Sequence, residues 1–472
     1  MPRKRNKTVI PAIRLEKYAA EGKSIATMED GKTLFVTGGI PGDVAEVLVL
    51  KNKKSFAEGK MLKIVTKSPQ RIEPFCGHFG TCGGCKWQML PYEQQLVFKQ
   101  QQVKDQLSRI GQVTLPEFEP ILGSVRQQFY RNKLEFTFSE LSYLTDEEIA
   151  ASEGTEITRK PALGFHAPGM FDKVVDIDTC FLQEDPTNKI KNLLRQWALE
   201  SGLGFYNSRT KEGWWRNVII RISTLGELMV NLIVKDEQPV LFETLGKLKE
   251  AVPGITSLHY TLNSKLNDTI YDLPVQTYYG KGFIEEQLGE FRYKISPKSF
   301  FQTNSYQAEK LYDIVRRFAG LSGREVVYDL YCGTGSIGIF LSGQAQKVVG
   351  IETVADAIKD AKVNAEWNHL NNCSFHVGDV SQVATDDFFE EHGRPDVIIT
   401  DPPRPGMSEK LIGQLLKMRA PKLVYVSCNP ATQARDLQWL DAAYQVDKIQ
   451  PVDMFPHTHH IENVALLTLK QK

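Results

Sequence analysis

The pattern of hydrophobic and polar positions changes near Gly323. Beyond it, short runs that are apolar throughout alternate with stretches whose apolar residues recur at helical spacing. Such runs are typical of strands buried on both faces, and their alternation with helices predicts an α/β fold with a doubly wound parallel sheet. We expect an antiparallel pair, 445–450 and 462–469, to follow. The predicted parallel strands are Val326–Leu330, Lys347–Ile351, Ser374–Val377, Val397–Ile399 and Leu423–Val426.

In the first part of the chain the hydrophobic pattern repeats over shorter segments. Strand-like runs are separated by turn signals such as Asp30-Gly31 and Gly38-Gly39, which predicts a small antiparallel β-barrel. The middle of the chain mixes strand-like and helical patterns, so we expect an α+β domain there. Because 472 residues exceed the size of a single core, the sequence predicts three domains, over residues 1–68, 69–282 and 283–472.

Composition narrows the class of protein. No apolar run approaches the roughly 18 residues that a membrane helix needs. The basic segment Met1–Lys7 is not followed by the apolar stretch of a secretion signal. Seven cysteines in a chain of this size favour thiol chemistry or metal binding over a disulfide framework. We therefore expect a cytoplasmic protein that does not contact membranes and acts as a monomer.

The net charge of zero hides an uneven distribution. Residues 1–70 hold 14 Lys and Arg against 7 Asp and Glu, and lysines surround Phe56. Basic residues around an aromatic ring suit contacts with nucleic acid. In the middle domain, 131–133 and 214–217 mix cations, amides and aromatics; this suits RNA, but core aromatics beside surface charges would look the same. An anionic macromolecule is the expected partner.

Three cysteines lie close together in the sequence. Cys76, Cys82 and Cys85 have the spacing Cys-x5-Cys-x2-Cys, among glycines that let the backbone wrap. A tetrahedral set needs a fourth ligand, and the next cysteine along the chain is Cys180. Four thiolates suit either Zn²⁺ or a 4Fe–4S cluster. The spacing leaves both open, and His78 could replace a thiolate if the metal is zinc.

The first turn of the predicted parallel sheet carries a second motif. It reads Asp329-Leu-Tyr-Cys-Gly-Thr-Gly-Ser-Ile-Gly338, and the next strand ends in Glu352. Glycines after a strand let a cofactor approach the backbone, and the acid can accept both ribose hydroxyls of an adenosine. This pattern fits NAD and S-adenosylmethionine equally. The loop Asp401-Pro-Pro-Arg404 favours S-adenosylmethionine, because many nucleic-acid methyltransferases have an Asp-Pro-Pro loop beside the methyl group.

The fifth parallel strand ends in a cysteine. Cys428 follows it directly, at the edge where open α/β sheets bind ligands. A lone free cysteine is more often a small packing residue than a nucleophile, and we interpret Cys332 and Cys373 in that way. The position of Cys428 beside the predicted cofactor site favours a nucleophile.

These motifs together resemble the S-adenosylmethionine-dependent RNA (uracil-5-)-methyltransferases that act on ribosomal or transfer RNA. The resemblance covers almost the whole chain. It implies a Rossmann-like class I methyltransferase domain at the C-terminus, a TRAM or OB-like barrel at the N-terminus and an RNA-binding central domain. The motifs that carry it are the basic barrel, the three-cysteine segment, Phe300–Asn304, the glycine turn, Asp401–Arg404, Ser427–Thr432 and Phe455–Val464.

The resemblance also implies roles for individual residues. Cys428 would be the nucleophile and Glu462 the general base. The thiolates of Cys76, Cys82 and Cys85, with the less tightly matched Cys180, would ligate a 4Fe–4S cluster. The residues implied to contact S-adenosylmethionine are Gln302, Tyr331, Gly333, Gly335, Ser336, Glu352, Asp379 and Asp401.

The chemistry of uracil explains these residue types. Its C5 is too weak a nucleophile for a sulfonium methyl until a thiolate adds at C6, and a base must then remove the C5 proton. Because a free thiol has a pKa of about 8.5, we expect Arg404, Arg435 or the field of the whole protein to lower the pKa of Cys428. The target base must also leave its stack.

Several alternatives remain open from the sequence. The cytosine-C5 methyltransferases, which use similar chemistry, have a different arrangement: their cysteine lies in or near the loop that corresponds to Asp401–Pro403. In this chain that loop contains no cysteine. A nicotinamide oxidoreductase would use only the glycine turn. A non-catalytic Fe–S RNA-binding protein would give Cys428 no role. Among RNAs, we prefer 23S ribosomal RNA because the basic barrel accompanies the cysteine segment, and transfer RNA is the second candidate.

Overall fold

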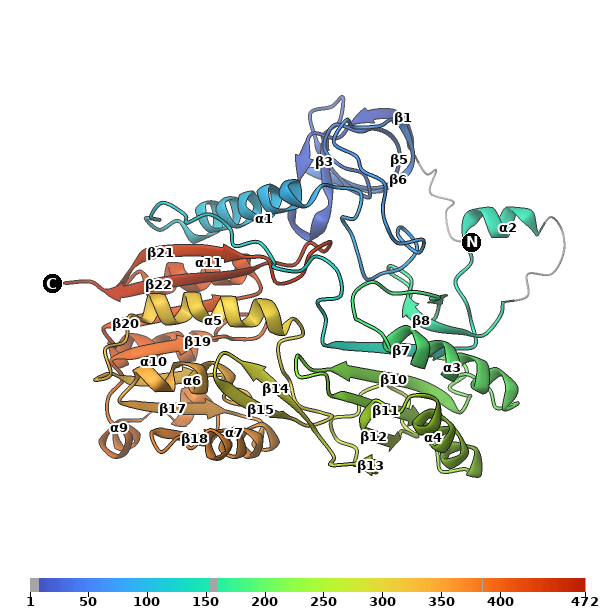
Figure 1. The fold of residues 1–472 in the computed structure, drawn as a ribbon. Helices are drawn as coiled ribbons and strands as arrows, with labels where there is room; N and C mark the ends of the chain where they lie inside the picture. The colour runs from blue at the N-terminus through green and yellow to red at the C-terminus, as the bar shows by residue number, and fades with distance from the viewer. Residues whose placement is uncertain (1–7, 153–158, 384, 472) are drawn as a thin grey trace.

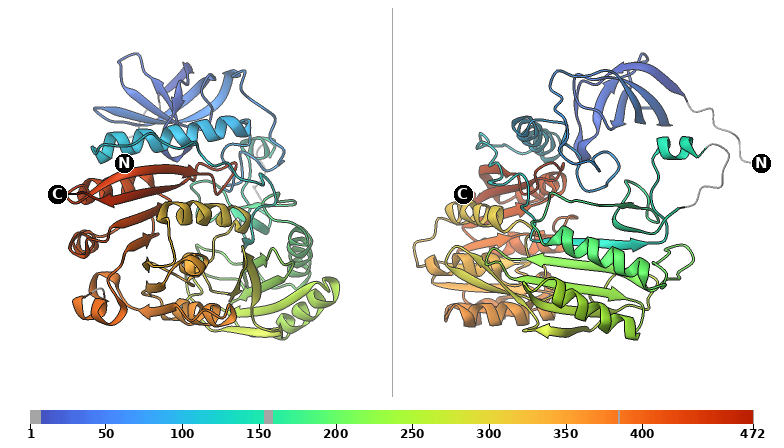
Figure 2. Two further views of the ribbon diagram at one scale, coloured as in Figure 1. Left: turned by 60° about the vertical axis from the view of Figure 1, so that its left-hand side comes forward. Right: turned by 45° about the vertical axis from the view of Figure 1, so that its right-hand side comes forward.

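The computed structural model describes residues 8–152, 159–383 and 385–471, so the basic segment Met1–Lys7 lies outside the described residues. These described residues form three large sheets and a two-stranded one. In Figure 1 the N-terminal sheet is at the top, the central sheet at the lower right and the C-terminal sheet at the lower left. Helix α1 (Tyr92–Gln106), followed by a π-helical turn (Leu107–Gly111), runs between the N-terminal and C-terminal sheets (Figure 2).

The N-terminal sheet has six strands in the order β1-β5-β6-β4-β3-β2 and closes around its own apolar core. Most neighbouring strands are antiparallel, as the sequence predicts. The prediction of a purely antiparallel barrel is wrong for one pair: β4 and β6 are parallel, because β6 turns back from β5 and inserts beside β4. The strands are β1 (Val9–Arg14), β2 (Lys17–Tyr18), β3 (Ser24–Thr27), β4 (Thr33–Thr37), β5 (Val44–Asn52) and β6 (Phe56–Thr66).

The central sheet has seven strands in the order β13-β12-β11-β10-β7-β8-β9. Of the two readings of residues 214–217, the core reading is confirmed. Trp214, Trp215 and Arg216 are buried, and the Arg216 guanidinium donates to backbone carbonyls of residues 263, 265 and 267. The elements are β7 (Lys133–Ser139), α2 (Asp146–Ala151), β8 (Ala162–His166), β9 (Val174–Asp176), α3 (Thr187–Glu200), β10 (Trp215–Ile222), β11 (Leu228–Val234), α4 (Pro239–Ala251), β12 (Ile255–Leu262) and β13 (Val275–Gly280).

The C-terminal sheet confirms the predicted doubly wound α/β fold. Its order is β18-β17-β16-β19-β20-β22-β21. The first five strands are parallel, β22 runs antiparallel to β20, and β21 runs antiparallel to β22. Its elements, after the hairpin β14 (Ile284–Leu288) and β15 (Phe291–Ile295), are α5 (Ser305–Ala319), β16 (Val326–Leu330), α6 (Ser336–Leu341), β17 (Lys347–Glu352), α7 (Ala355–Trp367), β18 (Cys373–Val377), α8 (Val380–Val383), α9 (Asp386–His392), β19 (Val397–Thr400), α10 (Glu409–Met418), β20 (Lys422–Ser427), α11 (Pro430–Leu440), β21 (Tyr444–Val452) and β22 (Glu462–Leu469).

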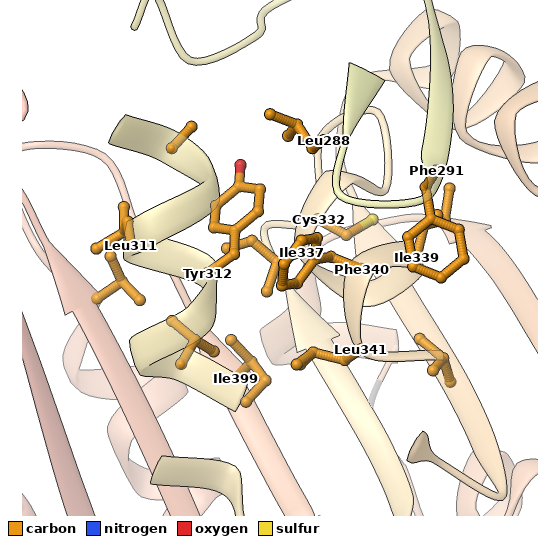
Figure 3. Packing of buried hydrophobic residues seen from close by; sticks show 14 of the residues in the cluster. Leu288, Phe291, Leu311, Tyr312, Cys332, Ile337, Ile339, Phe340, Leu341 and Ile399 are labelled. Atoms are coloured by element: carbon orange, nitrogen blue, oxygen red, sulfur yellow. The ribbon is translucent and has the colours of Figure 1, made fainter. Parts of the chain in front are cut away.

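Two apolar cores lie on the two faces of this sheet. Successive strand residues point to opposite faces, so Val327 and Val424 pack with α5, α6 and α7, whereas Tyr328 and Tyr425 pack with α10, α11 and α1. Figure 3 shows the first core, where Tyr312 of α5 lies beside Ile337 and Phe340. Cys332 is buried in this core, as its interpretation as a packing residue predicts. Within the described ranges, no helix is long and apolar enough to cross a membrane.

Candidate active site

The carboxyl ends of the parallel strands bring the predicted site residues to one edge of the C-terminal sheet. Tyr331 follows β16, Glu352 ends β17, Asp401 follows β19 and Cys428 follows β20. Strand β22 runs antiparallel to β20 and begins at Glu462, with Ser427 paired to Asn463. Continued by one residue, this register sets Cys428 across from Glu462. Distant parts of the sequence therefore meet at the ligand-binding edge of a doubly wound sheet.

The glycine turn between β16 and α6 forms the second part of the site. Gly335 has a φ of 78° and precedes α6, and a Cβ atom there would meet the Phe375 ring at 2.8 Å. This position therefore requires glycine. The backbone N–H of Gly333 donates to the Glu352 carboxylate at 3.2 Å, while a Cβ on Gly333 would meet nothing within 4 Å. The turn leaves open space beside a fixed carboxylate.

The remaining predicted cofactor residues lie around this turn with different partners. The Ser336 hydroxyl lies 2.9 Å from the Tyr312 hydroxyl. The backbone carbonyl of Gln302 accepts from the Asn132 side chain at 2.8 Å, which ties this segment to the central sheet. Asp379 is exposed, and one of its carboxylate oxygens already accepts from the Ser381 backbone and hydroxyl.

Burial and charge set the protonation of the Cys428 thiol. The half-buried thiol lies near the carboxyl groups of Glu462 and Asp401. Burial, reinforced by these two charges, raises the pKa of Cys428 to about 11, and Arg404 opposes this only in part. Arg404 lowers the pKa of Cys428, as expected, but by less than burial and the two carboxyl groups raise it, so the expected net lowering is wrong. Arg435 is turned away, because its guanidinium pairs with Asp436 and donates to the carbonyls of residues 405 and 407.

The two carboxyl groups beside the thiol also favour their neutral forms. Burial raises the pKa of Asp401 to about 7. Burial and the Asp401 charge raise the pKa of Glu462 well above its usual range, and Arg404 opposes this shift. A buried carboxyl group whose pKa is raised is suited to proton transfer near neutral pH. The loop that carries Arg404 is fixed to α11, because the side chains of Asn429 and Thr432 donate to the Arg404 carbonyl, each at 3.1 Å.

The four cysteines of the predicted metal site line one cavity of about 210 Å³, next to the central sheet. Cys76, Cys82, Cys85 and Cys180 are all free thiols. Throughout the described part of the chain, no three His, Cys, Asp or Glu side chains are arranged to hold a metal ion. The Nε2 atom of His78 accepts a hydrogen bond from the Asp178 backbone at 3.1 Å and is already engaged.

Comparison with known proteins agrees with this geometry. The family model for tRNA (uracil-5-)-methyltransferases matches residues 275–470, and the TRAM-domain model matches residues 12–62. An uncharacterized RNA methyltransferase of Bacteroides thetaiotaomicron is 52% identical over 456 residues, which cover 96% of this chain and 100% of the relative. The chain belongs to the tRNA (uracil-5-)-methyltransferase family. An uncharacterized RNA methyltransferase of Porphyromonas gingivalis is 48% identical over 95% of this chain and 98% of its own length.

A solved structure supports the same membership in the tRNA (uracil-5-)-methyltransferase family. The Pyrococcus abyssi tRNA (uracil-54, C5)-methyltransferase in complex with S-adenosyl-L-homocysteine superposes with a TM-score of 0.74 at 29% identity, covering 97% of this chain and 100% of its own. The present chain is thus an S-adenosylmethionine-dependent RNA methyltransferase with an N-terminal TRAM domain. The oxidoreductase and non-catalytic alternatives are set aside.

In this member of the tRNA (uracil-5-)-methyltransferase family, some side chains close to the site are not predicted from the sequence. Tyr312 faces the site from α5 and shares a hydrogen bond with Ser336. Lys99 and Asp453 form a fully buried ion pair behind the loop that leads to Glu462. A signal for Lys99 exists in the sequence, because residues 95, 99 and 103 are spaced by four along the buried face of α1. A charge in such a stripe requires a buried partner.

Proposed function

We propose that this enzyme transfers a methyl group to C5 of a uridine in RNA through a covalent intermediate, with Cys428 as the nucleophile and Glu462 as the general base. The observation that carries this proposal is the register of β20 and β22, which sets the thiol across from a buried carboxyl group. A nucleophile for C6 and a base for the C5 proton, next to each other at one sheet edge, are the groups that uracil C5 chemistry requires.

Each chemical step of the methyl transfer can then be assigned to a residue or to the methyl donor. The Cys428 thiol first loses its proton to solvent; the thiolate sulfur then bonds to C6, and the electron pair of the C5–C6 double bond passes to C5 and the adjacent carbonyl. S-adenosylmethionine would supply the methyl group as an electrophile and would leave as S-adenosylhomocysteine. The Glu462 carboxylate removes the C5 proton, the C5–C6 double bond re-forms, and the sulfur leaves C6 as a thiolate. The flipped uridine must reach the sheet edge, which is easier from single-stranded or loop RNA.

The glycine turn is proposed to hold S-adenosylmethionine. The open space over Gly333 supports this, because a cofactor can approach the backbone there. Glu352 would accept the ribose hydroxyls. Asp379 is proposed to contact the cofactor through its second carboxylate oxygen, because the first already accepts hydrogen bonds from Ser381. The full proposed set is Gln302, Tyr331, Gly333, Gly335, Ser336, Glu352, Asp379 and Asp401.

The rate of methyl transfer is expected to rise with pH. The reaction needs Cys428 as a thiolate and Glu462 as a carboxylate, and burial raises the pKa of both groups, that of Cys428 to about 11. Both reactive forms are therefore lost as the pH falls, and the rate should change by up to about tenfold per pH unit while one such group limits it. Single-turnover methylation between about pH 6 and pH 9, with RNA binding followed in parallel, measures this. A flat profile would show that the thiolate is already formed at low pH.

The four thiols are proposed to bind a 4Fe–4S cluster rather than zinc. Four cysteines around one cavity of about 210 Å³ are a suitable donor set for a cluster. The preference for a cluster rests on the resemblance to the RNA (uracil-5-)-methyltransferases; zinc, which would need the thiolates about 2.3 Å from a single ion, is the alternative. When bound, the cluster would cross-link the segment from Cys76 to Cys85 with Cys180.

Protein purified without oxygen is expected to be brown and to contain about four irons per chain. Cys180→Ser should lose most of the iron and the visible absorbance, because one of the four ligands is gone. Cys373→Ser is the matched control, since this half-buried thiol lies outside the cavity and should leave the iron content unchanged. Iron quantification and absorbance spectra measure both. Stoichiometric zinc in the wild-type protein would contradict the cluster.

The proposed RNA is 23S ribosomal RNA, because the basic barrel and the cysteine segment occur in one chain. Transfer RNA is the second candidate, favoured by the matching family's name and by the Pyrococcus abyssi enzyme. Mapping 5-methyluridine by mass spectrometry in both RNAs, from cells with and without the protein, tests the choice. Loss of the modification from transfer RNA alone would overturn the ribosomal assignment.

Three further expectations remain proposals. The division into domains 1–68, 69–282 and 283–472 is proposed, and it is supported by the strands of each large sheet falling within one of these ranges. A monomer is proposed, since the groups of the site come from one chain. A cytoplasmic location is proposed because none of the seven cysteines forms a disulfide bond, as is usual in a reducing compartment.

A further inference from the structure

The loop Asp453–Ile461 joins β21 to β22 and ends at Glu462. Glu462, the proposed base, is the first residue of β22. The end of this loop therefore determines where the Glu462 carboxyl group lies at the sheet edge. Within this loop His457 has a φ of 63°, which is uncommon for a residue other than glycine. A loop with such a backbone conformation keeps its shape only if its surroundings fix it.

Helix α1 fixes the first half of this loop. The Lys99 ammonium donates to the Asp453 carboxylate at 2.6 Å and to the Phe455 carbonyl at 3.1 Å. The side chains of both Lys99 and Asp453 are 0% exposed. The Tyr92 hydroxyl donates to the other Asp453 oxygen at 2.9 Å. Lys99 therefore neutralises the carboxylate and holds the loop backbone two residues further on.

Other parts of the chain fix the second half. The backbone N–H groups of Lys86 and Trp87, directly after Cys85, donate to the His457 carbonyl at 2.7 and 3.0 Å. Gln95 of α1 accepts from the His457 N–H at 2.9 Å. The Tyr130 hydroxyl donates to the Pro456 carbonyl at 3.0 Å. The loop is thus attached to α1, the cysteine segment and the central domain.

We propose that the Lys99–Asp453 ion pair is a positioning device for Glu462, which keeps the loop in the shape that aims the carboxylate at C5 of the target uridine. This inference rests on the proposed role of Glu462 as the base. Neither Lys99 nor Asp453 touches the substrate in this account; both act through the loop.

The energetics of buried ion pairs support a positioning role over simple stabilisation. Removing two charges from water costs about as much as their attraction returns, so a well-packed apolar pair would stabilise the fold equally well. What an apolar pair cannot supply is the directed contact of one ammonium with both the Asp453 carboxylate and the Phe455 carbonyl. Losing it releases the first half of the loop, and a displacement of about 1 Å at a reacting group can lower a rate by about 100-fold.

The test is Lys99→Met, which keeps most of the side-chain volume and removes the ammonium. With the base displaced, Cys428 can still add to the uridine, but removal of the C5 proton slows. We expect kcat to fall by about 10- to 100-fold with KM for RNA nearly unchanged, and a covalent protein–RNA adduct to accumulate on denaturing gels. A purely structural role would lower the folded fraction without producing an adduct.

Arg71→Met is the matched control. Arg71, just after the N-terminal domain, pairs with the buried carboxylate of Asp43 at 2.6 Å and is far from the loop in the sequence. This variant should lose thermal stability without accumulating an adduct. Tyr92→Phe removes a single hydroxyl from Asp453, so it should fold even if Lys99→Met does not, and should show the same adduct at a lower level.

Glu462→Gln, assayed in parallel, separates the two proposals. An adduct with Glu462→Gln but with neither Lys99→Met nor Tyr92→Phe would overturn the positioning role alone. No adduct with Glu462→Gln would overturn the proposed base and this inference with it. Adducts with all three, and none with Arg71→Met, are the expected result.

Discussion

Replacement of Cys428 by alanine is expected to abolish methyl transfer, with a loss on the order of 10⁶-fold, the size seen when an enzyme loses its nucleophile. Without the sulfur, uracil C5 never becomes electron-rich enough to attack a sulfonium methyl. RNA binding should persist, because the thiol is a small part of the surface that RNA would contact. Single-turnover transfer of a radiolabelled methyl group to RNA measures the loss, and filter binding measures retained affinity.

Cys373→Ala is the control for this substitution. Cys373 is a half-buried thiol of the same sheet that packs against the first apolar core, away from the ligand-binding edge. Its alanine variant should retain most of the activity. Turnover by Cys428→Ala within about tenfold of the wild-type rate would contradict covalent catalysis by this residue.

Glu462→Gln is expected to stop the reaction after the methyl group has been transferred. Glutamine has nearly the same shape as glutamate but cannot take up the C5 proton. The sulfur therefore stays bonded to C6, and the methylated RNA remains attached to the protein. A band of retarded mobility on denaturing gels, carrying both protein and labelled methyl group, is the expected result.

Two further observations define this experiment. The double variant Cys428→Ala/Glu462→Gln should form no adduct, because no sulfur is available to bond to C6. If Glu462→Gln binds RNA but neither forms an adduct nor loses turnover, another group must remove the proton. Asp401 would then be the first residue to consider, because its charge already acts on both Cys428 and Glu462.

Much of the fold could be predicted from local patterns. Strands of the parallel sheet are apolar on both faces, so their sequence signal is strong, and all five were found within a residue or two of their observed ends. The parallel pair β4 and β6 could not be predicted, because the order of strands depends on long-range pairing. The short strands β8 and β9 were missed because three to five residues carry little periodicity.

The candidate site was predicted well in position and less well in electrostatics. Motifs at strand ends place Glu352, Asp401 and Cys428 together in any doubly wound sheet. The pKa of Cys428 depends instead on which charges face it. The expected Arg435 guanidinium is occupied by Asp436, and burial of the thiol, reinforced by the two buried carboxyl groups, raises the pKa of Cys428 more than Arg404 lowers it. The Lys99–Asp453 pair joins residues 354 positions apart, and only a folded chain reveals such a contact.

The most direct test of the account uses RNA that carries tritium at C5 of uridine, taken from cells that lack the protein. Attack by Cys428, methyl transfer to C5 and proton removal by Glu462 together require that each methyl group gained expels one C5 hydrogen. The account predicts tritium released into water in equal amount to methyl groups incorporated. Methyl incorporation without tritium release would place the methyl group on another atom and contradict the proposed reaction.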